Sequence, residues 1–301
     1  MPNWGDVLKE IQAEANAPGP VDKIRRKYLR ELFQYTGRNI ILYYSGWLQR
    51  GNGKIAEQAT IFDGDINSFM ATINGLDTKK GLDLLLHTPG GYTTATEAIV
   101  SYLRKKFGTD IRAFIPQLAM SGGTMIACSC KEIYMGKESS IGPIDPQFGS
   151  MAAFAVLEEF KKAQDEVKKD PAKVPLWHAI FSKVDPGFLT KCQQAVELSN
   201  DLVLDWLKTG MFAHSKDKEA QADKIVKFLN NHRDTKAHDR HITAESAKAI
   251  GLNIKMLEED QTLQDLVLTV HHACMHTFSQ AANLHKMVEN HNGIGMFICG
   301  N

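Results

Sequence analysis

Ala119-Met120-Ser121-Gly122-Gly123-Thr124 is the stretch that decides how this chain folds, and Thr88-Pro89-Gly90-Gly91 stands thirty residues before it. Each motif follows a short apolar strand and opens a predicted helix. A strand-to-helix turn at Ser121 presents its hydroxyl at the head of a helix, and the glycines let backbone amides and a substrate approach closely. The sequence therefore predicts a serine nucleophile and an oxyanion hole to which the second glycine turn adds an N–H.

Strands and helices are predicted to alternate around these motifs. Apolar runs that are bounded by glycine, asparagine or aspartate indicate both kinds of element. The predicted strands are Asn39–Tyr44, Leu82–His87, Ile111–Ile115 and Ile133–Gly136, and the predicted helices are Asp65–Ile73, Thr93–Phe107 and Ser121–Cys130. This alternation is typical of parallel βαβ crossover units and indicates an α/β fold.

The flanking parts of the chain are predicted to be mostly helical. A helical arm around Val21–Phe33 precedes the first strand. After Gln147, helices are predicted at Met151–Lys169, Pro186–Lys208, Lys216–Asn231, Thr243–Gly251 and Asp260–Glu289, followed by a loose glycine-rich tail, Asn292–Asn301. We therefore divide the chain into an N-terminal helical arm (1–36), a main domain (37–258) and a C-terminal helix with its tail (259–301).

Composition narrows the possible partners and compartment. Of the 301 residues 43% are apolar, and 35 Lys and Arg residues balance 35 Asp and Glu residues, which leaves no electrostatic footprint for nucleic acid. The N-terminus has no apolar signal core, and the longest uncharged run, Ala113–Cys130, is broken by Pro116 and glycines. Five cysteines lack a framework spacing. We expect a cytoplasmic protein with reduced thiols and no membrane span.

Histidines gather on the last predicted helix. His272 and His276 are one turn apart, which suits zinc, but the third ligand and the glutamate of the usual enzyme pattern are missing. The apolar stripe of this helix puts Cys274 in the buried seam and the histidines, including His271, on or near the polar face. We expect no metal and no cofactor.

Three ordered motifs resemble the serine dehydrogenase proteinase family. They are Leu85–Gly91, Ala119–Ala127 and Ile141–Gln147, within a similarity that spans Ile40 to Leu252. That family is part of the wider Clp protease/crotonase superfamily, which also includes the signal peptide peptidase A group. The resemblance implies a Clp/crotonase-like ββα superhelix with a helical outer layer, and a homo-oligomer. It also implies a serine peptidase that cleaves peptides or unfolded protein through an acyl-enzyme on Ser121.

The resemblance implies further site residues. The N–H groups of Gly91 and Gly122 become the oxyanion donors. The Clp protease subunit carries its histidine a short segment after the serine, where this chain has Pro143–Pro146 and no histidine. The segment His238–Ala247 resembles the Clp segment that contributes the acidic triad member, which assigns Asp239 as the acid and the adjoining His238 as a base.

Alternatives stay open for the proton acceptor. His241 also adjoins Asp239, and Asp145 either takes part in the chemistry or only orients its loop. Signal peptide peptidase relatives use a serine–lysine dyad, for which Lys161 and Lys162 lie downstream, although their acidic neighbours predict a solvated helix face.

Two other functions also stay open. A non-proteolytic relative would bind an acyl thioester in the same oxyanion hole without using a serine nucleophile. A catalytically silent assembly protein is favoured by the missing histidine.

Overall fold

The computed structural model describes residues 4–50, 56–149, 151–230 and 237–300. The predicted helix end at Asn231 and the last tail residue, Asn301, lie outside the described residues. A mixed seven-stranded sheet forms the centre, in the order β10-β5-β3-β2-β1-β11-β12. The strands are β1 (Asn39–Ser45), β2 (Leu82–His87), β3 (Ile111–Ile115), β5 (Glu132–Met135), β10 (Ile254–Met256), β11 (Leu284–Asn290) and β12 (Gly295–Cys299). The first five are parallel to one another, and β11 and β12 are antiparallel to their neighbours.

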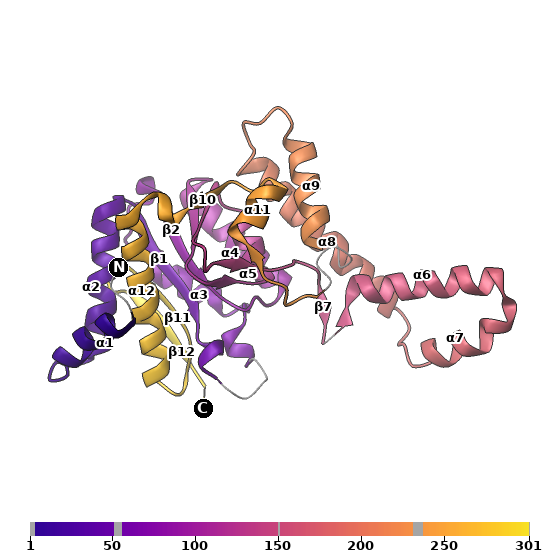
Figure 1. Ribbon diagram of the computed structural model, residues 1–301, viewed down its shortest axis with the longest axis horizontal. Coiled ribbons are helices and arrows are strands. Elements are labelled where there is room, and N and C mark those ends of the chain that lie inside the picture. The colour runs from indigo at the N-terminus through magenta and orange to yellow at the C-terminus, as the bar shows by residue number, and fades with distance from the viewer. Residues whose placement is uncertain (1–3, 51–55, 150, 231–236, 301) are drawn as a thin grey trace.

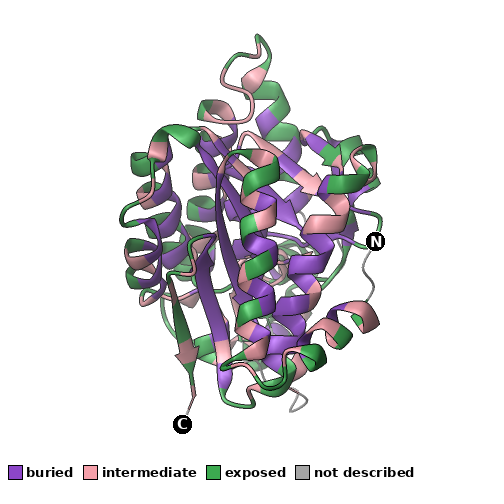
Figure 2. Ribbon diagram, turned by 90° about the vertical axis from the view of Figure 1, so that its left-hand side faces the viewer, coloured by how far each residue is buried: buried purple, intermediate pink, exposed green. Residues whose placement is uncertain are grey.

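Helices cover both faces of this sheet, which explains why its strands are nearly continuous apolar runs. Alternate residues of β1 face opposite sides: Leu42 and Tyr44 pack on one core cluster and Ile41 and Tyr43 on the other. The first face is covered by α1 (Trp4–Ala13), α2 (Pro20–Thr36) and α12 (Gln261–Gln280), which Figure 2 shows in front of the buried strands. The second is covered by α3 (Asp65–Ile73), α4 (Thr93–Phe107), α5 (Gly122–Cys128), α8 (Phe188–Thr209), α9 (Lys218–Asn230) and α11 (Ala244–Ile250).

A small second sheet joins three distant parts of the chain. Its strands are β4 (Leu118–Ala119), β6 (Ser140–Ile141) and β9 (Ile242–Thr243), in that order. Register aligns Ala119 with Ile141 and Ile141 with Ile242, the first pair parallel and the second antiparallel. Three segments therefore lie at the same edge of this sheet. Two of them follow Ala119 and Ile141, and the third precedes Ile242, because β9 runs in the opposite direction.

An arm projects from the body of the molecule (Figure 1). It contains α6 (Ala153–Lys169), a short 3₁₀ turn at Pro171–Lys173, α7 (Val174–Phe181) and the start of α8. Large apolar side chains are exposed along it, among them Met151, Val174, Leu176 and Ile180. This part of the chain leaves apolar surface without a partner in the monomer.

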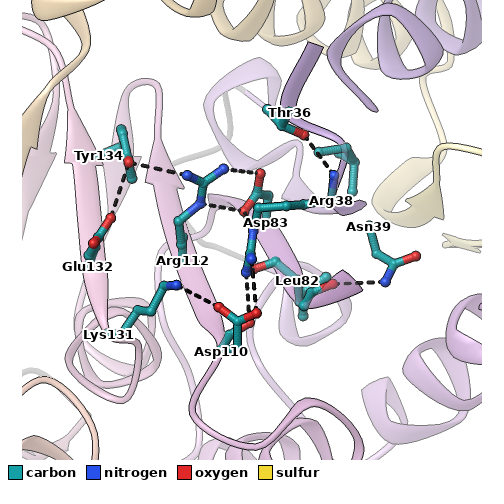
Figure 3. Close-up of polar contacts among 12 residues, drawn as sticks. Thr36, Arg38, Asn39, Leu82, Asp83, Asp110, Arg112, Lys131, Glu132 and Tyr134 are labelled. Carbon is teal, nitrogen blue, oxygen red and sulfur yellow. Dashed lines mark hydrogen bonds and ion pairs between the residues drawn. The ribbon is translucent and has the colours of Figure 1, made fainter. Parts of the chain in front are cut away.

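Charged side chains form a network where the parallel strands begin (Figure 3). The buried Asp83 carboxylate accepts hydrogen bonds from Arg38 Nε (2.8 Å) and Arg112 Nε (2.7 Å). Asp110 pairs with Arg38 and Lys131, and the hydrogen bond from Arg38 is the main reason that the pKa of Asp110 falls to about 2. Because Ser121 follows the other end of a strand, this network lies at the opposite edge of the sheet from the serine.

The C-terminal part differs from the sequence-based expectation. The last long helix ends at Gln280 instead of Glu289, because the last part of the predicted helix forms strand β11. The predicted loose tail contains strand β12, and the β11–β12 hairpin adds two strands beside β1. His271 and His276 are buried, so the expectation that they lie near the polar face is wrong. None of the helices in the described ranges has both the length and the apolar character that crossing a bilayer requires.

Candidate active site

The two glycine-containing turns lie side by side at the C-terminal ends of the parallel strands. The Thr88 N–H donates to Leu118 O and the Met120 N–H donates to Thr88 O, both at 3.0 Å. This bridge places the Thr88–Gly91 turn, which leads from β2 into α4, against the turn that leads from β4 into α5. Ligand sites of open α/β sheets lie at this edge.

Ser121 occupies a strained backbone conformation. Its φ is 48° and its ψ is −111°, and it is the one non-glycine residue with a positive φ in the described part of the chain. Such a conformation costs about 1–3 kcal/mol and persists where surrounding contacts impose it. One of these contacts is Gly90, where an added Cβ would lie only 2.7 Å from Ser121 Cβ. A strained serine between a strand and a helix is the geometry of a nucleophile elbow.

Two backbone amides beside Ser121 have no acceptor among the described residues: those of Gly91 and Gly122. They are close together, because an added Cβ at Gly122 would lie 3.5 Å from Gly91 N. The Gly91 turn is fixed by the Ile61 N–H donating to Gly90 O (2.8 Å) and the Tyr92 N–H donating to Ile61 O (2.9 Å). Two adjacent, fixed and unpaired N–H groups next to a serine hydroxyl form the arrangement of an oxyanion hole.

Thr124 fixes the serine turn to the neighbouring strand. Its hydroxyl lies 2.9 Å from both Ala119 O and Gly142 O, and it accepts the Gly142 N–H at 3.0 Å. The position of Ser121 is therefore tied to β6 and to the segment that follows it.

That segment carries Asp145, which pairs with His238. Asp145 is fully buried, and its Oδ1 lies 2.7 Å from His238 Nδ1. Its other oxygen, Oδ2, accepts a hydrogen bond from Gln147 Nε2 at 2.7 Å. The His238 side chain is 31% exposed, so its ring touches both the buried carboxylate and solvent. With Nδ1 on the carboxylate, Nε2 is the ring nitrogen left to exchange a proton.

The small sheet brings Asp145 and His238 toward the same edge as Ser121. From the aligned row Ala119–Ile141–Ile242, Ser121 follows β4, Asp145 follows β6, and His238 precedes the antiparallel β9. Neighbouring strands are about 4.8 Å apart, so this register keeps the three residues on one side of the sheet. Among the described residues the Ser121 hydroxyl makes no hydrogen bond to the His238 ring.

The other residues predicted for the site are exposed. The expectation that Asp239 is partly buried is wrong, because its side chain is exposed and the carboxylate that contacts His238 is Asp145. His241 is also exposed. Lys161 and Lys162 are exposed on α6 within the projecting arm, which confirms the prediction of a solvated helix face.

The Asp145–His238 contact was not anticipated from the sequence, because 93 residues separate its partners. The local signal was a single aspartate between two prolines in an otherwise apolar segment, Ile141–Pro146. A charged residue in such a segment needs a partner when it is buried.

One histidine next to the site, His87, is fully buried. His87 ends β2, directly before the Thr88–Gly91 turn, and its ring nitrogens lie 3.0 Å from Ser45 O and 3.1 Å from Gln117 Oε1. Burial lowers the pKa of His87 to about 4, so this histidine is neutral at pH 7. Within the described ranges no group of three or more His, Cys, Asp or Glu residues has the geometry to hold a metal ion.

Comparison with known proteins identifies the family to which the chain is similar. A family model described as ClpP-like SDH-type serine proteinase matches residues 25–267. One uncharacterised protein of Methanocaldococcus jannaschii is 29% identical over 244 residues, which cover 80% of this chain and 78% of that protein. A second from the same organism is 30% identical over 173 residues, which cover 58% of this chain and 51% of that protein.

Proposed function

Because the chain belongs to the ClpP-like SDH-type serine proteinase family, we propose that it is an endopeptidase of peptides or unfolded protein with Ser121 as its nucleophile. The observation that carries this proposal is the strained Ser121 turn beside the two unpaired amides of Gly91 and Gly122. The buried Asp145, in contact with His238 Nδ1, supports His238 as the general base.

The proposed reaction follows from these positions. His238 Nε2 takes the proton of the Ser121 hydroxyl as Oγ attacks the scissile carbonyl carbon, and the N–H groups of Gly91 and Gly122 hold the resulting oxyanion. Asp145 orients the ring and stabilises its charged form without taking the proton. The ring then protonates the leaving amine, which leaves an acyl-enzyme on Ser121. Water, deprotonated by the same histidine, hydrolyses that ester. This step requires the Ser121 hydroxyl and His238 Nε2 to come within hydrogen-bonding distance when substrate binds.

Covalent labelling tests the nucleophile. A fluorophosphonate should modify the wild-type protein at Ser121, as located by mass spectrometry of the labelled peptide. Ser121→Ala should abolish both labelling and casein cleavage while leaving thermal unfolding nearly unchanged, because the side chain is small and half-exposed. Ser129→Ala is a matched control, since Ser129 caps the other end of α5. Wild-type cleavage by Ser121→Ala, or labelling that is independent of Ser121, would refute the proposal.

One observation favours a second candidate function. Both N–H groups of the proposed oxyanion hole are unpaired, yet among the described residues the Ser121 hydroxyl has no hydrogen bond to a base. Binding of an acyl thioester needs only the hole. Tight binding of acyl-coenzyme A without fluorophosphonate labelling would support that function. A protein that shows neither property would instead be a catalytically silent assembly protein.

We also propose that the protein is a homo-oligomer. The support is the exposed apolar surface of the projecting arm, including Leu176 and Ile180. Apolar surface of this kind on a monomer marks an interaction site.

A further inference from the structure

A buried ion pair links the C-terminal hairpin to α3. Lys286 of β11 and Asp65, the first residue of α3, both have side chains with no exposed surface, and Lys286 Nζ lies 2.7 and 2.8 Å from the two carboxylate oxygens. The Tyr43 hydroxyl donates to Asp65 Oδ2 at 2.6 Å. Burying such a pair in place of apolar side chains seldom adds stability. The ammonium group of Lys286 makes one further hydrogen bond.

That remaining contact reaches the backbone beside the site. Lys286 Nζ donates to Thr60 O at 2.5 Å. Lys286 is paired with Ser45 across β1 and β11, and the Ser45 hydroxyl donates to Ala59 O at 2.6 Å. Two neighbouring side chains of the sheet therefore hold two consecutive carbonyls, immediately before Ile61.

Ile61 connects these two carbonyls to the proposed oxyanion hole. Its N–H and C=O make the two hydrogen bonds that flank Gly91, to Gly90 O and from Tyr92 N. Gly91 and Ile61 pack closely against each other, since an added Cβ at Gly91 would lie 2.2 Å from Ile61 O. Ile61 also lies beside Gly122, because its Cδ1 would be 3.0 Å from a Cβ added there.

We propose that Lys286 is a positioning residue for the proposed oxyanion hole, which it holds in place through Thr60 and Ile61. The proposal rests on the proposed function of the Ser121 site. Lys286 lies beyond residues 25–267, the part of the chain that matches the family. The C-terminal hairpin thus supplies a brace for a site whose reacting groups all lie within the matched part.

The test removes the ion pair without leaving a lone buried charge. In the Lys286→Met/Asp65→Asn double variant, a displacement of the Gly91 amide by about 1 Å should lower kcat about 100-fold. KM should stay near its wild-type value, because the loss falls on the transition state. Fluorophosphonate labelling of Ser121 should slow in parallel, and hydrogen exchange of the peptide that contains Tyr92 should become faster.

A matched control lies on the same strand. Glu289 of β11 forms an equally buried ion pair with Arg25 of α2, and neither side chain contacts residues 59–61. Arg25→Met/Glu289→Gln should change thermal stability but keep the wild-type kcat and labelling rate. Equal losses of kcat in both double variants would overturn the proposal, because the effect would then be general destabilisation.

The remaining outcomes are also decisive. A folded Lys286→Met/Asp65→Asn variant with wild-type kcat and wild-type exchange at Tyr92 would overturn the proposal. If that variant does not fold, Ser45→Ala removes only the hydroxyl that holds Ala59 O, and it must lower kcat at unchanged KM for the proposal to stand. Failure of the proposed function is distinguishable, because wild-type protein would then not label at Ser121.

Discussion

Asp145→Asn tests the proposed site most directly, because it changes the carboxylate that contacts His238. The substitution keeps the volume of the side chain, and the surroundings decide how the new amide sits. Gln147 Nε2 donates to Oδ2, so the amide oxygen must take that position. The amide NH₂ then replaces Oδ1, 2.7 Å from His238 Nδ1.

This orientation sets the magnitude of the effect. An NH₂ group facing Nδ1 excludes a proton there, so His238 carries its proton on Nε2 and is unable to accept the proton of Ser121. Loss of the correct tautomer lowers kcat by about 10³–10⁴-fold in serine triads, which corresponds to roughly 4–5.5 kcal/mol in the barrier. The loss of a charged hydrogen bond should lower the free energy of unfolding by only about 1–3 kcal/mol.

The assay compares variants on a peptide ester and by the rate of fluorophosphonate labelling, with thermal unfolding measured alongside. Asp239→Asn is the matched control: Asp239 adjoins His238 in sequence, but its side chain is exposed, so its kcat should stay near the wild-type value. The reasoning is refuted if folded Asp145→Asn keeps more than about a tenth of wild-type kcat, or if Asp239→Asn is the more damaging change.

Four further predictions follow from the structure. Gly91→Ala should abolish labelling and lower the melting temperature, because its Cβ would lie 2.2 Å from Ile61 O; normal labelling would contradict the oxyanion assignment. In native protein one thiol, the exposed Cys299, should react quickly with a disulfide reagent, and Cys299→Ser should remove this reaction, since the other four cysteines are buried. Burial lowers the pKa of Lys286 to about 8, with Asp65 and Tyr43 facing it. Between about pH 8 and 10.4 the unfolded state therefore binds more protons than the folded state, so the free energy of unfolding should rise with pH in this range. Urea titrations should show a rise that is about 1–3 kcal/mol larger in the wild type than in Lys286→Met/Asp65→Asn. Sedimentation should show a species larger than 33.5 kDa, and Leu176→Glu/Ile180→Glu should shift it toward the monomer; a wild-type monomer at micromolar concentration would contradict the oligomer proposal.

Local signals were enough to predict most of the sheet and its crossover helices. The predicted bounds of β2, β3, α3 and α4 are confirmed residue for residue, because each shows the apolar spacing of its element and has a glycine, an asparagine or a proline next to one of its ends. The adjacency of the Thr88–Gly91 and Ser121 turns was also predictable. Both motifs follow parallel strands, whose C-terminal ends meet at one edge of a sheet.

Pairings between distant segments were not predictable. The apolar residues of β11 fit the stripe of a longer helix as well as they fit a strand; they are Leu284, Met287 and Val288. Only the pairing of β11 with β1 selects the strand. Asp145 and His238 are ordinary residues in their own segments, and they come together only because β6 pairs with β9. Sequence reasoning therefore indicated the proposed nucleophile and the proposed base, but it assigned Asp239 in place of Asp145 as the carboxylate that contacts His238.

The position of β11 in the chain has a consequence for synthesis. The ribosome makes Ser121 and both glycine turns well before it makes Lys286, so a nascent chain carries every proposed reacting group before the proposed brace exists. Until β11 pairs with β1, the Thr60 carbonyl lacks its ammonium partner and one side of β1 stays open. A peptidase with this order of assembly would become fully active only after its C-terminal hairpin has left the ribosome. Its own nascent chain and neighbouring proteins would therefore be protected from cleavage during synthesis. A premature stop before Lys286 would, for the same reason, yield a product with all the family motifs and little activity.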